Sequence, residues 1–288
     1  SELQITTSKN IKNIKEIKMN YASNKEQILI YLGKFKRNFL NSNGWYSFIS
    51  TAIIALITCI VAVKDGFSTD LGAEVKSTSF IIVCACIWIG VFNSITLICK
   101  ERDIIKHEYR GGMNLSSYMF AHMLFQALVS LIQAIIFSSI LFLFYHHSIS
   151  EFKTIFDNDS LRFISYFLTI FLTIYSADAL GLFVSSIVKN VEKAMTVMPF
   201  VILLQFLFAG NIPLNGFLQF LSYFTLSRYS FDGLLDLVGF KEGGSFFSTS
   251  TKVQVNLLVT WILLIAFSIL LAYLASKLLK SVEKDTRG

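Results

Sequence analysis

Long apolar runs alternate with short polar connections along most of this chain. A helix that crosses the hydrocarbon core of a bilayer needs about 20 apolar residues, and five or six of the runs qualify. We therefore predict an all-α integral membrane protein with six spanning helices. They fall at residues 45–63, 80–99, 118–145, 163–188, 194–214 and 255–279.

The stretch after the fifth run decides the number of spans. Turn residues at 211–216 precede an apolar run, 217–226, that is too short to cross a membrane. A seventh span there would carry the basic C-terminal tail to the outer side. With six spans, 18 of the 25 Lys and Arg residues lie on the cytoplasmic side, as the positive-inside rule expects. We therefore predict a re-entrant or surface-lying outer segment at 217–240, and cytoplasmic N- and C-termini.

The residues before the first run have the pattern of an amphipathic helix. Ser23 and Glu26 have capping-box spacing, and apolar residues then recur at helical spacing at Ile28, Leu32, Phe35 and Phe39. We predict a connecting helix at 23–40, between a linker or N-terminal tail at 1–22 and the membrane domain at 41–288. Because its polar side is basic, we expect its apolar stripe to lie in the headgroup layer of the inner leaflet. The alternative is a linker helix packed on the domain.

Composition agrees with a membrane protein. Hydrophobic residues make up 54% of the chain, charged residues 15%, and the mean hydropathy is +0.60. The net charge of +6 arises from cations that flank apolar runs, so topology explains it and no nucleic-acid partner is expected. The bias toward Lys, Asn, Ile and Phe is typical of an AT-rich bacterial genome. We expect a multi-pass protein of a bacterial cell membrane, surrounded by lipid.

The chain contains no recognisable catalytic motif. There is no phosphate-binding loop, nucleophile elbow or zinc-protease motif, so we predict no intrinsic catalytic site, no metal site and no cofactor bound by this chain. Asp178 is the one acid deep in an apolar run, and it either bonds to a neighbouring helix or faces a transport pathway. An integral membrane enzyme built on Asp178 and the His146/His147 pair is one alternative function. A passive channel or accessory membrane subunit is another.

The segment 100–117 is the most informative. It is too charged to enter lipid, yet Ile104, Ile105 and Tyr109 form a helical apolar stripe. We predict a short amphipathic helix on the cytoplasmic side. Either a partner covers its stripe, or the helix is solvated with nothing docked on it.

Three groups of residues resemble a known family. The first is Glu101-Arg102, His107-Glu108-Tyr109, Gly112 and Ser116-Ser117-Tyr118; the second is Gly181-Leu182, Ser185-Ser186, Val188-Lys189-Asn190, Glu192-Lys193-Ala194-Met195, Pro199-Phe200 and Phe208-Ala209-Gly210; the third is Leu221-Ser222-Tyr223 and Ser227-Arg228-Tyr229. They are similar to the permease domains of white-type (G subfamily) ABC transporters and their bacterial ABC-2 relatives.

The resemblance implies a half-transporter that pairs with a second, identical or different, permease half. An ABC ATPase, separate or fused, would bind ATP and Mg and drive export of a hydrophobic or amphipathic drug, peptide or lipid. The coupling helix would contain Glu101, Arg102, Ile105, Glu108 and Tyr109, and a second coupling loop would contain Lys189, Glu192 and Lys193. The substrate pathway would be lined by Cys86, Ile89, Leu203 and Phe206. The outer gate would be Asn211 and Ile212, where the family has a leucine plug.

Overall fold

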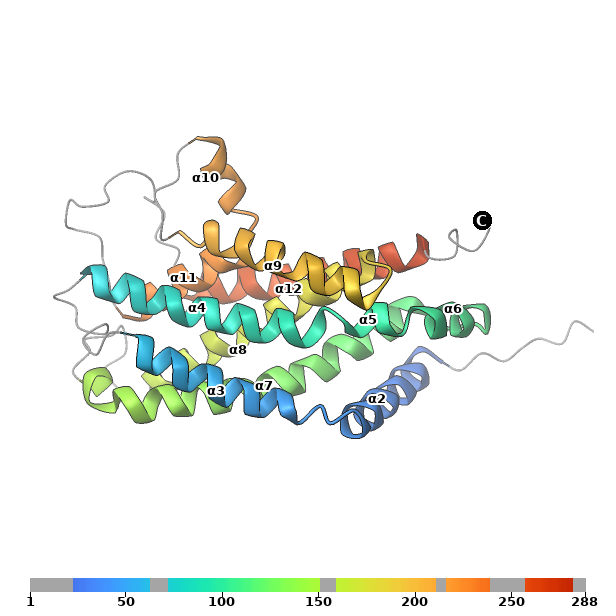
Figure 1. Ribbon diagram of the computed structural model, residues 1–288, viewed down its shortest axis with the longest axis horizontal. Coiled ribbons are helices and arrows are strands. Elements are labelled where there is room, and N and C mark those ends of the chain that lie inside the picture. Colours follow the sequence, from blue (N-terminus) through green and yellow to red (C-terminus); the bar gives the residue numbers. More distant parts are fainter. Residues whose placement is uncertain (1–22, 63–71, 151–158, 211–215, 239–256, 282–288) are drawn as a thin grey trace, which may run out of the picture.

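The computed structural model describes residues 23–62, 72–150, 159–210, 216–238 and 257–281, and the regular structure in these residues is helical. Most of the helices run along the long axis of a bundle (Figure 1). They are α2 (Asn24–Asn41), α3 (Tyr46–Val61), α4 (Gly72–Ser94), α5 (Leu97–Lys100), α6 (Arg102–Arg110), α7 (Leu115–Ser150), α8 (Asp159–Ile187), α9 (Val191–Leu207), α10 (Phe217–Ser222), α11 (Leu226–Leu237) and α12 (Leu257–Ser281).

The predicted apolar runs correspond to helices α3, α4 with α5, α7, α8, α9 and α12. Four helical stretches of the described residues are long and apolar enough to cross a membrane, namely Glu74–Lys100, Leu115–Phe144, Phe163–Ile187 and Leu257–Lys280. Helices α2 and α3 are bent by 69° at their junction, and the pair taken together would be a fifth. Helix α9 has 17 residues, the lower limit for a span. The all-α membrane architecture is confirmed, while the total of six spans stays a prediction.

Helix α2 begins with the capping box that the sequence predicts. The backbone N–H of Ser23 donates to the Glu26 carboxylate at 2.8 Å, and the Ser23 hydroxyl accepts from the Glu26 N–H at 3.4 Å. The pKa of Glu26 is lowered mainly by the hydrogen bond from the Ser23 backbone, and to a smaller extent by the hydrogen bond with the Ser23 side chain. The box satisfies two of the amide groups that a helix start leaves unpaired, and it fixes where the connecting helix begins.

The apolar stripe of α2 packs on protein, so the expectation that it lies in the headgroup layer is wrong. Phe35 is buried, and Ile28 and Leu32 pack against the same apolar cluster. The Phe35 ring stacks on His122 of α7 with 3.8 Å between ring centroids, and it meets Tyr118 edge-on at 5.6 Å. Burial of such rings stabilises the helix pair more than a headgroup layer would, since the rings leave water completely and gain specific contacts. The alternative of a linker helix packed on the domain is the one observed.

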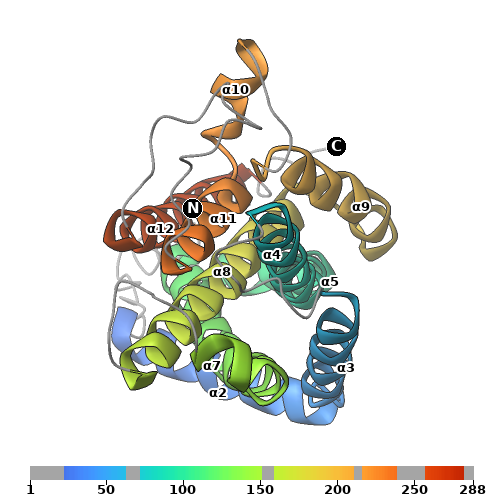
Figure 2. The ribbon, with the colours of Figure 1, turned by 90° about the vertical axis from the view of Figure 1, so that its left-hand side faces the viewer.

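Helix α8 lies at the centre of the bundle and contacts α4, α7, α11 and α12 (Figure 2). Its contact with α4 is the most extensive, and glycine makes it possible. A Cβ on Gly90 of α4 would lie 2.5 Å from the backbone oxygen of Ile174 and 2.9 Å from the nitrogen of Asp178. A Cβ on Gly181 of α8 would lie 3.1 Å from the backbone oxygen of Val91. Small residues allow this close approach in a membrane, where lipid competes for every apolar surface.

The segment after α9 does not cross the bundle. Helices α10 and α11 have 6 and 12 residues, both too short to span. Nine residues of α11 are buried among α4, α8, α9 and α12 at the end opposite α6 (Figure 1). Arg228 is 3% exposed there, and it meets the Asp232 carboxylate at 3.9 Å and the Tyr223 ring at 4.5 Å. The Asp236 carboxylate accepts from the Leu257 N–H at 2.8 Å, so α11 also caps α12.

We expect Gly90→Ala to destabilise the bundle by about 1–3 kcal/mol, the usual cost of overpacking, because its Cβ would overlap the Ile174 carbonyl. Thermal unfolding in detergent, followed by intrinsic fluorescence, would measure the loss. Gly33→Ala is the matched control, since nothing lies within 4 Å of that Cβ position and alanine favours a helix; its midpoint should stay or rise. Equal midpoints for Gly90→Ala and the unaltered protein would contradict close α4–α8 packing.

Candidate coupling site

The approach to α6 is held in place by α8. Helix α4 ends at Ser94, and the chain continues through the short helix α5. The Ser185 hydroxyl on α8 accepts from the backbone N–H groups of Ile98 and Cys99, at 3.1 and 3.0 Å. A break between helices leaves such amides without partners. The hydroxyl therefore fixes the point from which α6 leaves the bundle.

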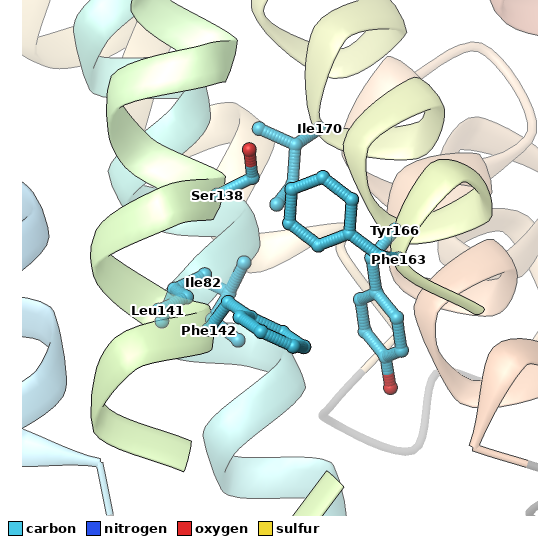
Figure 3. A pocket seen from close by; sticks show the side chains of 7 residues that line it. All are labelled: Ile82, Ser138, Leu141, Phe142, Phe163, Tyr166 and Ile170. Atoms are coloured by element: carbon cyan, nitrogen blue, oxygen red, sulfur yellow. The ribbon is translucent and has the colours of Figure 1, made fainter. Parts of the chain in front are cut away.

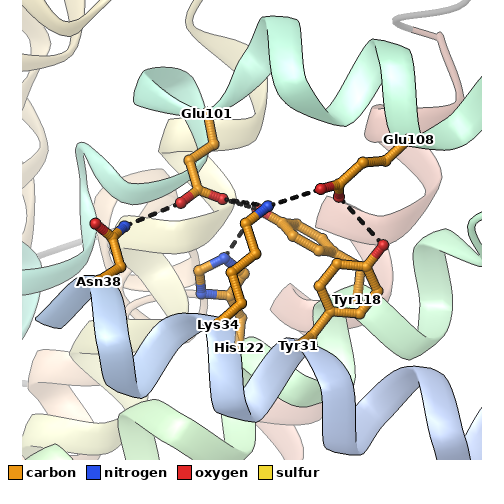
Figure 4. A network of polar contacts seen from close by, with 7 residues as sticks. All are labelled: Tyr31, Lys34, Asn38, Glu101, Glu108, Tyr118 and His122. Atoms are coloured by element: carbon orange, nitrogen blue, oxygen red, sulfur yellow. Dashed lines mark hydrogen bonds and ion pairs between the residues drawn. The ribbon is translucent and has the colours of Figure 1, made fainter.

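The charged centre of the site is Lys34 of α2, which lies between two carboxylates (Figure 4). Its Nζ is 3.0 Å from the Glu108 carboxylate and 3.5 Å from that of Glu101. The Glu101 side chain is 10% exposed, and that of Glu108 is 32% exposed. A carboxylate withdrawn from water this far needs a compensating charge and hydrogen bonds. Lys34 supplies the charge from a different helix, so α2 and α6 are joined.

Neutral side chains supply the remaining hydrogen bonds to both carboxylates. Asn38 donates to Glu101 at 3.0 Å and the Tyr118 hydroxyl donates to it at 3.4 Å, while Tyr31 donates to Glu108 at 3.1 Å. Burial, followed by the nearby Glu108 charge, raises the pKa of Tyr31, so its hydroxyl keeps the proton that it donates. The ring of His122 lies 2.9 Å from the Tyr118 hydroxyl and extends the network into α7. Helices α2, α6 and α7 therefore share one polar cluster.

Arg102 connects α6 to the second predicted coupling loop. Its guanidinium donates to the backbone oxygen of Val188, just after α8, at 2.9 Å. Lys189, Glu192 and Lys193 follow at the exposed start of α9. The structure thus brings the first residue of α6 next to the loop, while the three charged side chains of the loop face outward.

Helix α6 has an inner and an outer face, and the predicted stripe is divided between them. Ile105 is 1% exposed and Tyr109 packs against the same apolar cluster, whereas Ile104 is 47% exposed. The outer face also carries the exposed side chains of Asp103, His107 and Arg110. The stripe is split because adjacent residues of a helix point about 100° apart. Whether a partner covers the outer part at Ile104 stays a prediction.

Asp178 joins two helices within the membrane. Its carboxyl group is fully buried. One oxygen accepts from the Gln126 amide at 3.0 Å and the other from the Ser130 hydroxyl at 2.5 Å, both on α7. Of the two roles expected from the sequence, this geometry matches a hydrogen bond to a neighbouring helix.

The four residues predicted to line a substrate pathway do not share one surface of this chain. Cys86 and Ile89 are 1% and 3% exposed in the interior, while Leu203 on α9 is 60% exposed. Phe206 is half-buried and meets the Phe80 ring edge-on at 6.3 Å. The pathway therefore stays a prediction. The proposed gate residues Asn211 and Ile212 lie outside the described residues, as do the side chains of His146 and His147.

A small cavity lies between α4, α7 and α8 in the membrane-length part of the bundle (Figure 3). Its volume is about 20 Å³, which is room for roughly one water molecule. It is too small for a transport substrate. The lining residues are Ile82, Ser138, Leu141, Phe142, Phe163, Tyr166 and Ile170. In the described parts of the chain, no three His, Cys, Asp or Glu side chains come together to hold a metal ion.

Five of the seven residues of the polar cluster in Figure 4 were not predicted as site residues from the sequence. Tyr31, Lys34, Asn38, Tyr118 and His122 belong to it, and Lys34 is 74 positions from Glu108. One signal was present: Tyr31, Lys34 and Asn38 are three and four residues apart, so they form a polar stripe beside the apolar stripe of α2.

A bundle of membrane-length apolar helices, with a charged helix at one end, is the architecture of a multi-pass membrane protein. Residues 26–238 match the model of the ABC-2 type transporter family, and this is well over half of the chain. The chain therefore belongs to the ABC-2 type transporter family, which confirms the resemblance noted in the sequence. It is similar to ABC transporter G family member 5 of Arabidopsis thaliana, with 23% identity over 227 residues. The match covers 76% of this chain and 34% of that protein, so this chain spans about a third of its relative's length.

We expect Lys34→Met to destabilise the protein by about 1–3 kcal/mol, because it leaves Glu101 and Glu108 without their cation. The value lies below that of a fully buried pair because Glu108 is partly solvated. Thermal unfolding in detergent would measure it, with Lys36→Met on the exposed side of α2 as the control. Adding Glu101→Gln should recover part of the loss. Equal effects of Lys34→Met and Lys36→Met would contradict the ion cluster.

We expect Asp178→Asn to change stability by less than about 1 kcal/mol, because an amide oxygen can still accept from Gln126 or Ser130. Asp178→Leu should cost about 1–3 kcal/mol, since it leaves the Gln126 amide without its acceptor, while Ser130 keeps its bond to the Gln126 backbone oxygen. Denaturation in detergent compares the two variants directly. If Asp178→Asn folds stably but abolishes transport, the acid has a role in transport beyond joining the helices.

Proposed function

We propose that this permease is half of an ATP-driven exporter, and that an ABC ATPase binds it at α6. The observation that carries the proposal is the position of α6. This helix stands at one end of the bundle with Ile104 exposed on its outer face, while its inner face is tied to α2, to α7 and to the end of α8. A partner that tilts α6 would therefore move three other helices.

The charges of α6 suit a docking element. The charges of Glu101, Arg102 and Glu108 are already paired on the inner side of the helix. Docking on the outer face around Ile104 then needs no new partners for Glu101, Arg102 and Glu108. The same end of the bundle carries the start of α2 and the end of α12 (Figure 1), and it is rich in Lys and Arg. This arrangement supports cytoplasmic termini.

The partner ATPase would bind ATP and Mg, either as a separate subunit or as a domain of the same polypeptide. A second permease half would complete the pathway. The name of the plant relative, an ABC transporter, supports ATP-driven transport. The substrate we propose is hydrophobic or amphipathic, such as a drug, peptide or lipid. The support for this is the predicted pathway residues, of which Ile89, Leu203 and Phe206 are apolar and Cys86 is only weakly polar.

One variant tests binding of the ATPase to α6, and a second tests whether α6 passes movement of the ATPase on to the other helices. We expect Ile104→Glu to weaken association with the ATPase by about 10- to 100-fold, since burial of an isoleucine contributes about 1.5–3 kcal/mol and a buried charge opposes docking. Copurification from membranes with graded ATPase levels would measure the affinity. Asn41→Glu, which adds the same charge at the exposed end of α2, should leave association unchanged.

Glu108→Ala should keep the ATPase bound but reduce substrate-stimulated ATP hydrolysis severalfold, because it removes the contacts of α6 with Lys34 and Tyr31. The rate in proteoliposomes, with and without substrate, measures this. If the substrate stimulates ATP hydrolysis equally in Glu108→Ala and in the unaltered protein, Glu108 has no role in coupling. Solute flux in liposomes of the chain alone, without nucleotide, would instead indicate a channel.

A further inference from the structure

The lysines of α2 divide into two groups. Lys34 faces α6 and its carboxylates. Lys25 and Lys36 are exposed, and neither has an acidic partner among the described residues. Residues advance by about 100° along a helix, so Lys36 lies about 200° from Lys34. Lys25 lies close to the direction of Lys36, on the side of α2 opposite the polar cluster.

The same exposed side is also apolar. Leu29 is 68% exposed and Leu40 is 59% exposed. Relative to Lys25 they follow at four and fifteen positions, so helical periodicity places them beside Lys25 and Lys36. We call Lys25, Leu29, Lys36 and Leu40 the free face of α2. Leucines paired with cations on long stems are the composition of a helix that lies at a lipid surface.

The bend between α2 and α3 places α2 near the membrane boundary. Helix α2 is bent by 69° from α3, so it lies across the end of the bundle while α3 runs along it (Figure 2). Trp45 and Tyr46 stand at the bend, 47% and 58% exposed and stacked at 4.2 Å. Exposed aromatic residues at the end of an apolar helix mark the headgroup level. Helix α2 therefore lies close to the headgroup level, and its free face is exposed there.

We infer that the free face of α2 binds anionic phospholipid headgroups in the leaflet on the α6 side. Lys25 and Lys36 meet the lipid phosphates, and Leu29 and Leu40 enter the acyl boundary. Charge complementarity selects anionic lipid over zwitterionic lipid. Since α2 also holds Lys34 against α6, lipid bound on one side of α2 orients the helix that carries the cluster on its other side.

The test uses the whole chain, purified from membranes that contain phosphatidylglycerol and phosphatidylcholine, with retained lipid counted by native mass spectrometry. We expect Lys25→Gln combined with Lys36→Gln to reduce the enrichment of phosphatidylglycerol by about fivefold for each cation. Lys25→Arg with Lys36→Arg should keep the enrichment. Lys106→Gln with Arg110→Gln on α6 removes the same charge away from the free face and should change it by less than about twofold.

Thermal midpoints of all three double variants should agree, since Lys25, Lys36 and Arg110 are exposed and Lys106 makes only a surface ion pair with Asp103. Unchanged enrichment in the α2 glutamine variant, or equal loss in the α2 and α6 variants, would overturn the inference. Loss of ATPase copurification with unchanged lipid binding would also overturn it, because the face would then belong to the ATPase. The lipid measurement needs no ATPase, so it stands or fails independently of the proposed coupling through α6.

Discussion

The contact of Lys34 with Glu101 and Glu108 is the interaction on which the organisation of one end of this protein depends. Glu101 is buried where the chain leaves the membrane-length part of the bundle, and a carboxylate in that position needs a cation. The cation comes from α2, a helix that the sequence places far away. The ion cluster thus converts three separate segments, α2, α6 and the start of α7, into one unit. Hydrogen bonds from Tyr31, Asn38 and Tyr118 leave little freedom in how the unit is assembled.

The helices of the rest of the bundle are fixed rigidly to one another. Gly90 and Gly181 let α4 and α8 approach to backbone contact, and Asp178 ties α8 to α7. Ser185 holds the chain on α8 as it enters α6. A displacement of α6 therefore passes into helices that are fixed to one another by close packing and polar contacts. Interfaces of this kind shift between discrete arrangements, because packed side chains do not deform continuously.

Much of the fold could be predicted because a membrane sets helix length and polarity. The apolar runs located all the long helices, and the capping box located the start of α2. Boundaries were less exact where buried polar residues extend a helix: α4 begins at Gly72, since Thr78 and Ser79 are buried among neighbouring helices. The stripe of α2 was placed in lipid because amphipathicity alone does not distinguish a lipid surface from a protein surface. Its aromatic residues, Phe35 and Phe39, were the better indication of protein packing, and both rings contact α7.

The candidate site was predictable only in its local part. The charged residues of α6 follow from one continuous segment, whereas their partners come from α2 and α7 and depend on tertiary contacts.

The most direct test of the account is a photo-cross-linking amino acid placed at position 104 in living cells. The account predicts a covalent product with an ABC ATPase on the cytoplasmic side. A probe that reacts only with lipid or with extracellular reagents, and never with an ATPase, would contradict it.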